Sequence, residues 1–252
     1  LTSDEGNLDP RLNFKELDLC NSVRTSDVVK SIKPDFVINC AAEASEILSP
    51  HIRHFSYKNN ILSHANLLNA CVNHDVEKVI IFSSIGVYGH LRPPFTETMV
   101  PQPADPYSVG KLMVEKDTEA VYNYFGLKYS IVRPFNLFCK YQQYNNRYRN
   151  FLAIAIRKVL LGEPITIFGD GNQKRAFSSC ECLNLPIEQL LYDRNGHVFN
   201  IGSSKPIRIL DAAELIQKVG KQLGYDSDIV HLDERKEVKL AWSSTEKAEQ
   251  ML

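Results

Sequence analysis

The sequence has no long uninterrupted apolar run and no excess of charge of one sign. None of its apolar stretches approaches the roughly 18–20 residues that a membrane-spanning helix requires, and its 29 basic residues nearly balance its 30 acidic ones. This balance argues against a nucleic acid or an anionic membrane as the main partner. No signal-like apolar core is found near the start, so a cytoplasmic protein is expected.

Cysteine is also scarce. Six cysteines among 252 residues do not suggest a disulfide framework. Four lie in or beside apolar runs and are expected to be small buried thiols: Cys20, Cys40, Cys71 and Cys139. Cys180 and Cys182 form a lone Cys-x-Cys, with no second Cys or His pair at a matching spacing. Because a metal site needs about four ligands, the sequence predicts no metal site.

The sequence does contain short apolar runs that alternate with longer segments of helical spacing. The short runs suit strands buried on both faces: residues 14–19, 35–42, 78–84 and 129–134. The helical segments between them are residues 26–32, 51–74 and 108–125. The alternation predicts an α/β fold with a parallel sheet, helices on both faces and functional groups at the carboxyl ends of the strands.

The second half is less regular. It contains a helix at 151–161, a short strand at 165–168, a Gly169-Asp170-Gly171 turn, a core strand at 198–201 and a helix at 209–223. This mixture predicts a smaller lobe built on the sheet.

Tyr107 and Lys111 are spaced so that both lie on one face of a helix. A nearby ammonium favours the phenolate and is expected to lower the tyrosine pKa, which makes the pair suited to moving an alcohol proton. By itself the pair is common on exposed helices. Ser83 and Ser84 end an apolar strand, and a proline-rich loop brings the chain from there to Tyr107. Two hydroxyls at such a strand end are placed to meet a ligand, although they also suit a plain strand-to-loop junction.

Together with four further motifs, these residues resemble the extended short-chain dehydrogenase/reductase superfamily, and within it the NAD-dependent nucleotide-sugar epimerases and dehydratases. The motifs are Arg133-Pro-Phe-Asn136, Phe168-Gly-Asp-Gly-Asn-Gln-Lys-Arg175, Phe199-Asn-Ile-Gly202 and Arg235-Lys-Glu-Val238. The resemblance implies a Rossmann-type doubly wound parallel sheet with a smaller C-terminal substrate-binding lobe. The NAD-binding core would comprise residues 1–140 and about 175–204, and the lobe about 141–174 and 205–252.

The resemblance also implies site residues. Ser84 and Tyr107 would bind the sugar hydroxyl that is oxidised, and Lys111 would hold the nicotinamide ribose. The remaining positions expected to line NAD are Asp18, Leu19, Cys40, Ala41, Ala42, Asn60, Ser83 and Phe135. Asn136, Arg175 and Arg235 would bind the diphosphate of the sugar nucleotide, which is expected to be a UDP-sugar. Tyr144, Asn145, Arg147 and Arg149 are expected to help shape the sugar pocket, with a plain solvated loop as the alternative.

The two residues after Ser84 bear on the reaction. Relatives that dehydrate the sugar carry an Asp-Glu pair there, whereas this chain has Ile85 and Gly86, which cannot transfer a proton. The resemblance therefore implies C4 epimerisation through a 4-keto sugar. Another nucleotide-sugar oxidoreductase or dehydratase, a keto-sugar reductase and a non-catalytic binding subunit remain as alternatives.

The sequence departs from the family at its start. The glycine-rich turn that binds the cofactor's pyrophosphate is not present, and we expect the first β-α unit to be absent and the lobe to be incomplete at its C-terminus. The resemblance also implies a homodimer formed through the helices at 51–74 and 108–125.

Overall fold

The computed structural model describes residues 9–142, 148–235 and 237–252. Its centre is a parallel sheet with the strand order β1-β2-β3-β8. The strands are β1 Phe36–Asn39, β2 Lys78–Phe82, β3 Lys128–Pro134 and β8 His197–Ile201. The central strand β2 is formed by the run Lys-Val-Ile-Ile-Phe, whose β-branched residues suit a strand covered on both faces.

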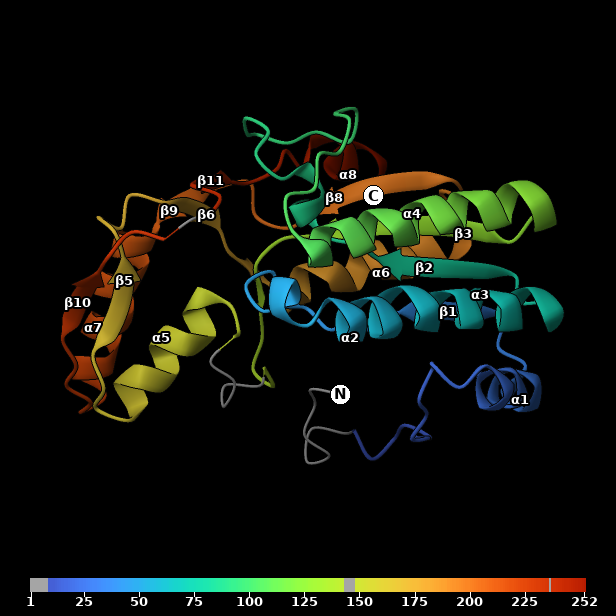
Figure 1. The fold of residues 1–252 in the computed structure, drawn as a ribbon, viewed down its shortest axis with the longest axis horizontal. Helices are drawn as coiled ribbons and strands as arrows, with labels where there is room; N and C mark the ends of the chain where they lie inside the picture. Colours follow the sequence, from blue (N-terminus) through green and yellow to red (C-terminus); the bar gives the residue numbers. More distant parts are fainter. Residues whose placement is uncertain (1–8, 143–147, 236) are drawn as a thin grey trace.

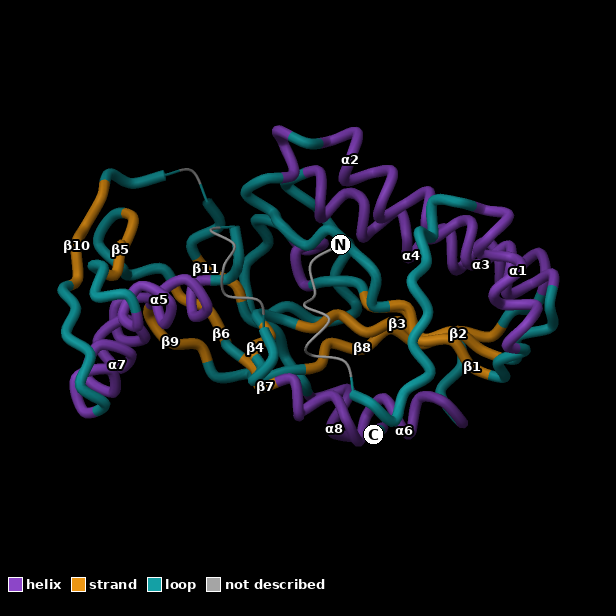
Figure 2. The backbone as a smooth tube through the Cα atoms, turned by 90° about the horizontal axis from the view of Figure 1, so that it is seen from below, coloured by secondary structure: helices purple, strands orange, loops and turns teal. Residues whose placement is uncertain are grey.

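Helices cover both faces of this sheet (Figure 2). On one face lie α1 Ser22–Ile32, α2 Arg53–Tyr57, α3 Ser63–Asn73 and α4 Pro106–Phe125. On the other lie α6 Asn184–Tyr192 and α8 Glu246–Met251. Successive residues of β2 point to opposite faces, so Val79 and Ile81 join the core under α3 and α4, whereas Ile80 joins the core under α6 and α8. The predicted doubly wound α/β fold is confirmed.

Helix α4 ends where the sequence predicts and begins two residues earlier, at Pro106 rather than Ser108. Asp105 accepts a hydrogen bond from the Ser108 amide as the N-cap, and Pro106 occupies the first turn, where a missing amide costs nothing. Gly126, which follows the helix, adopts the left-handed conformation. These signals place Tyr107 in the first turn of the helix, beside the carboxyl end of the sheet.

A smaller lobe lies at the left of Figure 1, beyond the carboxyl ends of the strands. It contains α5 Phe151–Leu160 and α7 Ile209–Gln222, which pack on the parallel pair β5 Ile165–Phe168 and β10 Ile229–Leu232. A second small sheet has the order β11-β6-β9, with β6 Lys174–Ala176, β9 Pro206–Arg208 and β11 Leu240–Ala241. The short pair β4 Leu137–Phe138 and β7 Ser178–Ser179 joins the lobe to the core.

Three expectations differ from the structure. Residues 14–19 form no strand, because none of the described segments pairs with them and an extended segment needs a hydrogen-bonded neighbour. Residues 246–251 were assigned to the lobe, yet as α8 they pack against β8 and return the chain to the sheet. Cys40 and Cys139 are exposed rather than buried, because both lie just past the end of a strand.

The helices among the described residues are all too short or too polar to cross a membrane. No group of three His, Cys, Asp or Glu side chains gathers to hold a metal ion in residues 9–142, 148–235 and 237–252.

Candidate functional site

The carboxyl end of β2 and the first turn of α4 bring Ser84 and Tyr107 together. Ser84 ends the strand in an extended conformation, and its hydroxyl accepts a hydrogen bond from the Gly86 amide at 3.0 Å. The Ser84 hydroxyl also lies near enough to Tyr107 to favour its phenolate. Tyr107 is buried and Ser84 is half-buried. Two hydroxyls from different elements thus meet at the edge of the sheet where a ligand is expected.

The environment of Tyr107 differs from the sequence prediction. Burial and the nearby Glu46 carboxylate raise the pKa of its phenol well above the ordinary value, and the nearby Ser84 hydroxyl only partly offsets this. The predicted lowering by Lys111 is wrong for this structure, because the Lys111 ammonium lies 6.0 Å from the centre of the tyrosine ring and is directed elsewhere. Tyr107 therefore holds its proton at neutral pH.

Lys111 lies one turn further along α4 and is also buried. Its Nζ donates a hydrogen bond to the Phe82 carbonyl oxygen at 2.7 Å. Burial lowers the pKa of its ammonium to about 8, while nearby Cys40 and Glu115 act in the opposite direction. Lys111, four residues after Tyr107 on the same face of α4, therefore places an amine with a lowered pKa between the ends of β1 and β2.

The end of β1 presents small side chains. Cys40 and Ala41 are exposed and Ala42 is half-buried, so a flat ligand can approach the backbone there. Asn60 lies beneath this segment, where its amide oxygen accepts a hydrogen bond from the Glu43 amide at 2.7 Å and its Nδ2 donates to the Glu43 carbonyl at 3.0 Å. Asn60 thus holds the strand end in place.

Asn60 lies within one turn of π-helix, Lys58–Leu62, between α2 and α3. Such widened turns are frequent at functional sites. No residue pattern signals this turn, since the stripe of apolar residues runs through it without interruption.

Asp18 and Leu19 lie at the far side of β1. The Asp18 carboxylate is exposed and accepts a hydrogen bond from the Cys20 amide, which lowers its pKa. The Leu19 side chain packs on the core, and its carbonyl oxygen accepts a hydrogen bond from Asn66 of α3 at 2.9 Å. This pair is therefore fixed to α3, with the carboxylate left free to meet solvent or a ligand.

Ser83 belongs to a buried polar network that the sequence did not reveal. Its hydroxyl donates a hydrogen bond to Glu115 of α4, which also accepts two hydrogen bonds from Arg133 of β3. Arg133 Nη1 donates to the Tyr88 hydroxyl at 2.8 Å, and Tyr88 in turn donates to Asn200 of β8. The network ties three neighbouring strands and α4 together behind the site, and so positions Ser84 and Lys111.

The predicted phosphate-binding arginines meet at the edge of the lobe. Arg175 Nη2 lies 3.9 Å and Arg235 Nη2 lies 3.1 Å from the Glu237 carboxylate. Arg175 also donates to the backbone carbonyls of Lys174, Val238 and Lys239. Arg235 stacks 4.1 Å over the Phe168 ring. Two guanidinium groups around one carboxylate form a site suited to a diphosphate.

Phe135 and Asn136 connect the core to the lobe. Phe135 is fully buried, and a Cβ on Gly202 would lie 2.8 Å from its ring, so glycine is needed for this contact. Asn136 adopts the left-handed backbone conformation and donates from Nδ2 to the Ala176 carbonyl at 2.9 Å. Both residues lie beside β6 and Arg175, although each side chain makes contacts within the protein. Tyr144, Asn145 and Arg147 lie outside the described residues.

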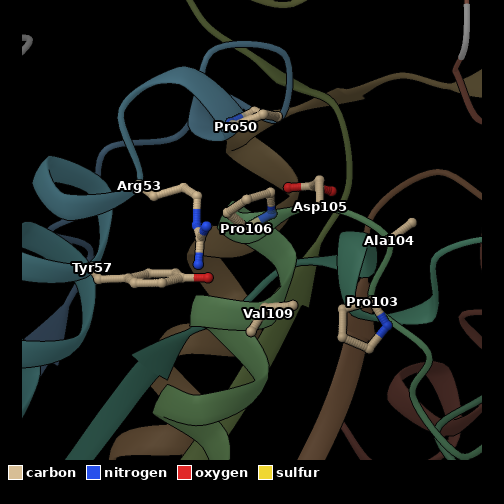
Figure 3. A pocket seen from close by; sticks show the side chains of 8 residues that line it. All are labelled: Pro50, Arg53, Tyr57, Pro103, Ala104, Asp105, Pro106 and Val109. Carbon is tan, nitrogen blue, oxygen red and sulfur yellow. The ribbon is translucent and has the colours of Figure 1, made fainter.

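A shallow pocket of about 310 Å³ opens on the other side of the α4 N-terminus. Arg53 and Tyr57 of α2 point toward Pro106 and Val109 of α4 across it (Figure 3). None of the predicted site residues lines this pocket, which belongs to the outer face of α2 and α4.

Comparison with known proteins identifies the family of this chain. Residues 2–202 match the NAD dependent epimerase/dehydratase family. The chain belongs to this family, whose members use NAD.

Three relatives show the extent of the similarity. UDP-glucuronate 4-epimerase of Thermodesulfobacterium geofontis is 27% identical over 95% of this chain and 74% of its own length. The structure of UDP-glucose 4-epimerase from Thermotoga maritima with UDP-glucose superposes with a TM-score of 0.92 at 26% identity, covering 98% of this chain and 80% of that protein. UDP-glucuronic acid 4-epimerase from Bacillus cereus, in complex with UDP-glucuronic acid and NAD, gives 0.85 at 29% identity, with 97% and 76% covered.

Proposed function

We propose that this chain epimerises a nucleotide-diphosphate sugar, a UDP-sugar, at C4 through a transient 4-keto intermediate. The observation that carries the proposal is that Ser84 and Tyr107 meet at the carboxyl end of β2, with Lys111 one helical turn away. Family membership supports a nucleotide-sugar epimerase or dehydratase. The arrangement at Gly86 favours the epimerase.

Gly86 cannot be replaced by a proton-transferring residue without rearrangement. A Cβ at this position would lie 2.5 Å from the Ser108 Oγ atom, closer than real contacts allow. Ile85, the other residue of the pair, is buried among apolar side chains. An elimination of water needs an acid and a base close to the sugar, and neither of these two positions supplies one.

Ser84 and Tyr107 have complementary tasks in the proposed reaction. The Ser84 hydroxyl hydrogen-bonds the C4 hydroxyl group and orients it. Tyr107 Oη accepts the C4 hydroxyl proton as the C4–H electron pair leaves, and returns that proton when the keto group is reduced. Burial keeps most of Tyr107 protonated, so the rate of C4 oxidation depends on the small fraction of the protein that carries the phenolate. Reduction of the keto group uses the proton that Tyr107 then holds.

The described residues fit NAD at the end of β1. The small, exposed Cys40 and Ala41 leave the backbone open to a flat group, and Lys111 Nζ lies between β1 and β2 to hold a ribose. The cofactor, when bound, supplies the acceptor for the C4 hydride. Asp18 at the far end would meet the adenosine side, and Arg175 and Arg235 would bind the sugar's diphosphate.

The outer face of α2, α3 and α4 supports a homodimer. It carries exposed apolar side chains on α2, on the π-helical turn that leads into α3, and on α4, namely Phe55, Leu62 and Met113. Exposed apolar patches of this kind mark interaction surfaces.

The test is an assay of the purified full-length protein with NAD⁺ and a panel of UDP-sugars, followed by NMR of the products. The proposal expects interconversion of a C4 pair with no net change in NADH. Formation of a 4-keto-6-deoxy sugar would identify a dehydratase, and no turnover of any UDP-sugar would contradict the proposal.

A further inference from the structure

A carboxylate from outside the predicted site lies beside the reacting hydroxyls. A Cβ built on Gly86 would be 3.2 Å from Glu46 Oε1 and 3.3 Å from Ser84 Oγ. The Glu46 carboxylate and the Ser84 hydroxyl therefore both lie beside Gly86. Glu46 belongs to the turn between β1 and α2, and its side chain keeps solvent access.

The turn that carries Glu46 is fixed to the start of α4. The Ser49 hydroxyl lies 3.0 Å from the Glu46 carbonyl oxygen and 3.3 Å from Asp105 Oδ1. It also accepts a hydrogen bond from the Tyr107 amide at 3.1 Å. Ser49 is fully buried, so this junction is part of the fold. Glu46 is thereby held in a set position relative to Tyr107.

The charges that face Glu46 come from three elements. Asp105 at the N-terminus of α4 and Glu237 of the lobe disfavour its ionised form, whereas Arg175 of β6 favours it. Tyr107 also faces it, and the Glu46 charge is the second cause of the raised Tyr107 pKa. Although the residue keeps solvent access, desolvation by the protein atoms that surround its carboxylate is the largest effect, and together with these charges it raises the pKa of Glu46 to about 7.

We propose that Glu46 is a specificity-determining residue of the sugar subsite, which selects uncharged hexoses over sugars that carry a carboxylate. This inference rests on the proposed function, because it assumes that the reacting sugar lies against Ser84 and Tyr107. An ionised Glu46 accepts hydrogen bonds from sugar hydroxyls and repels a uronate carboxylate that lies against Ser84 and Tyr107.

The proposal separates this chain from two of its relatives. The proteins from Thermodesulfobacterium geofontis and Bacillus cereus are both named for glucuronate substrates. With a carboxylate at Glu46, this chain accepts UDP-glucuronate only when Glu46 takes up a proton. Uronate binding therefore weakens as pH rises through the titration of Glu46, whereas the binding of UDP-glucose does not.

The experiment compares UDP-glucose and UDP-glucuronate in two ways between pH 6 and 8.5. The first measurement is the ratio of their kcat/KM values, and the second is the ratio of their Kd values from calorimetry. Effects of Tyr107 are common to both sugars and cancel in these ratios. The variants are Glu46→Gln, which keeps the shape, and Glu119→Gln, which removes the same charge from the exposed side of α4.

In the wild-type protein and in Glu119→Gln, we expect the preference for UDP-glucose to increase about 10-fold or more across this range. In Glu46→Gln the preference should be smaller and independent of pH. A ratio that is unchanged by Glu46→Gln at every pH would overturn the inference. If neither sugar is turned over but the Kd ratio behaves as described, the proposed reaction fails and the role of Glu46 stands.

Discussion

Arg133 and Glu115 form a two-point ion pair inside the protein, with Nη2–Oε2 at 2.6 Å and Nε–Oε1 at 2.8 Å. Their side chains are only 5% and 2% exposed. The pair joins β3 to α4 directly behind Ser83, and it strongly raises the pKa of Arg133. Both charges therefore depend on each other, because neither can be solvated by water.

Removing one partner should destabilise the protein. We expect Glu115→Ala to lower the free energy of unfolding by about 3–5 kcal/mol, because the Arg133 charge is left buried and unpaired. Urea denaturation measures this. In Glu119→Ala, which breaks an exposed pair with Lys116, the loss should stay within about 1 kcal/mol. Equal losses of unfolding free energy in the two variants would show that the buried pair stabilises the protein no more than the exposed pair does.

The raised pKa of Tyr107 predicts the pH dependence of the reaction. Its folded-state pKa lies above the ordinary value, so the phenolate fraction increases about 10-fold per pH unit throughout the neutral range. The rate of C4 oxidation should increase with it up to at least pH 9, and Tyr107→Phe should lower kcat/KM by about 10²–10⁴-fold. Steady-state rates from pH 6.5 to 9 measure both, and a flat profile would contradict the assigned role.

His64 predicts a stability change in acid. This buried side chain lies 3.3 Å from Asn39 Nδ2 and 3.1 Å from Thr118 Oγ1, and because Thr118 donates its own proton to Val114, the ring is neutral with its proton on Nε2. Burial lowers its pKa to about 3. Below pH 6.5, His64 takes up a proton in the unfolded chain but stays neutral in the folded protein, so the free energy of unfolding falls as the pH drops.

The size of this effect can be measured by difference. We expect the wild-type protein to lose about 2–3 kcal/mol more than His64→Gln between pH 6.5 and 4. His90→Gln changes an exposed histidine and serves as the control. Parallel stability curves for the wild-type protein and His64→Gln would show that His64 titrates normally.

The homodimer proposal makes a prediction about mass in solution. Leu62→Asp places a charge on the exposed face of the π-helical turn before α3, and Met113→Asp places one on the exposed face of α4, where burial at an interface would be costly. We expect light scattering to find a dimer for the wild-type protein and a monomer for both variants. Leu215→Asp, at an exposed position of α7 in the lobe, should remain dimeric. Dimeric Leu62→Asp and Met113→Asp would place the interface elsewhere.

Local patterns predicted much of the fold and the centre of the site. The apolar run at 78–84 predicted β2, and the spacing of Tyr107 and Lys111 predicted two side chains on one helical face. Each of these depends on residues close together in the chain, so the pattern itself carries the information.

The parts that the sequence did not predict depend on contacts between distant segments. Glu46 reaches Tyr107 only because Ser49 is fixed to Asp105, and nothing in the residues around Glu46 signals this. The protonated state of Tyr107 follows from burial in the folded protein. The buried network of Glu115 and Arg133 likewise needs α4 and β3 in place before it can be recognised.

The central claim is that one hydride leaves C4 and returns to it. The most direct measurement is NMR and mass analysis of the product formed from UDP-glucose deuterated at C4, with the full-length protein and NAD⁺. The account predicts UDP-galactose that retains the deuterium at C4, and no product from a variant that lacks both Ser84 and Tyr107 hydroxyls. Loss of the deuterium to solvent, or a product altered at another carbon, would contradict it.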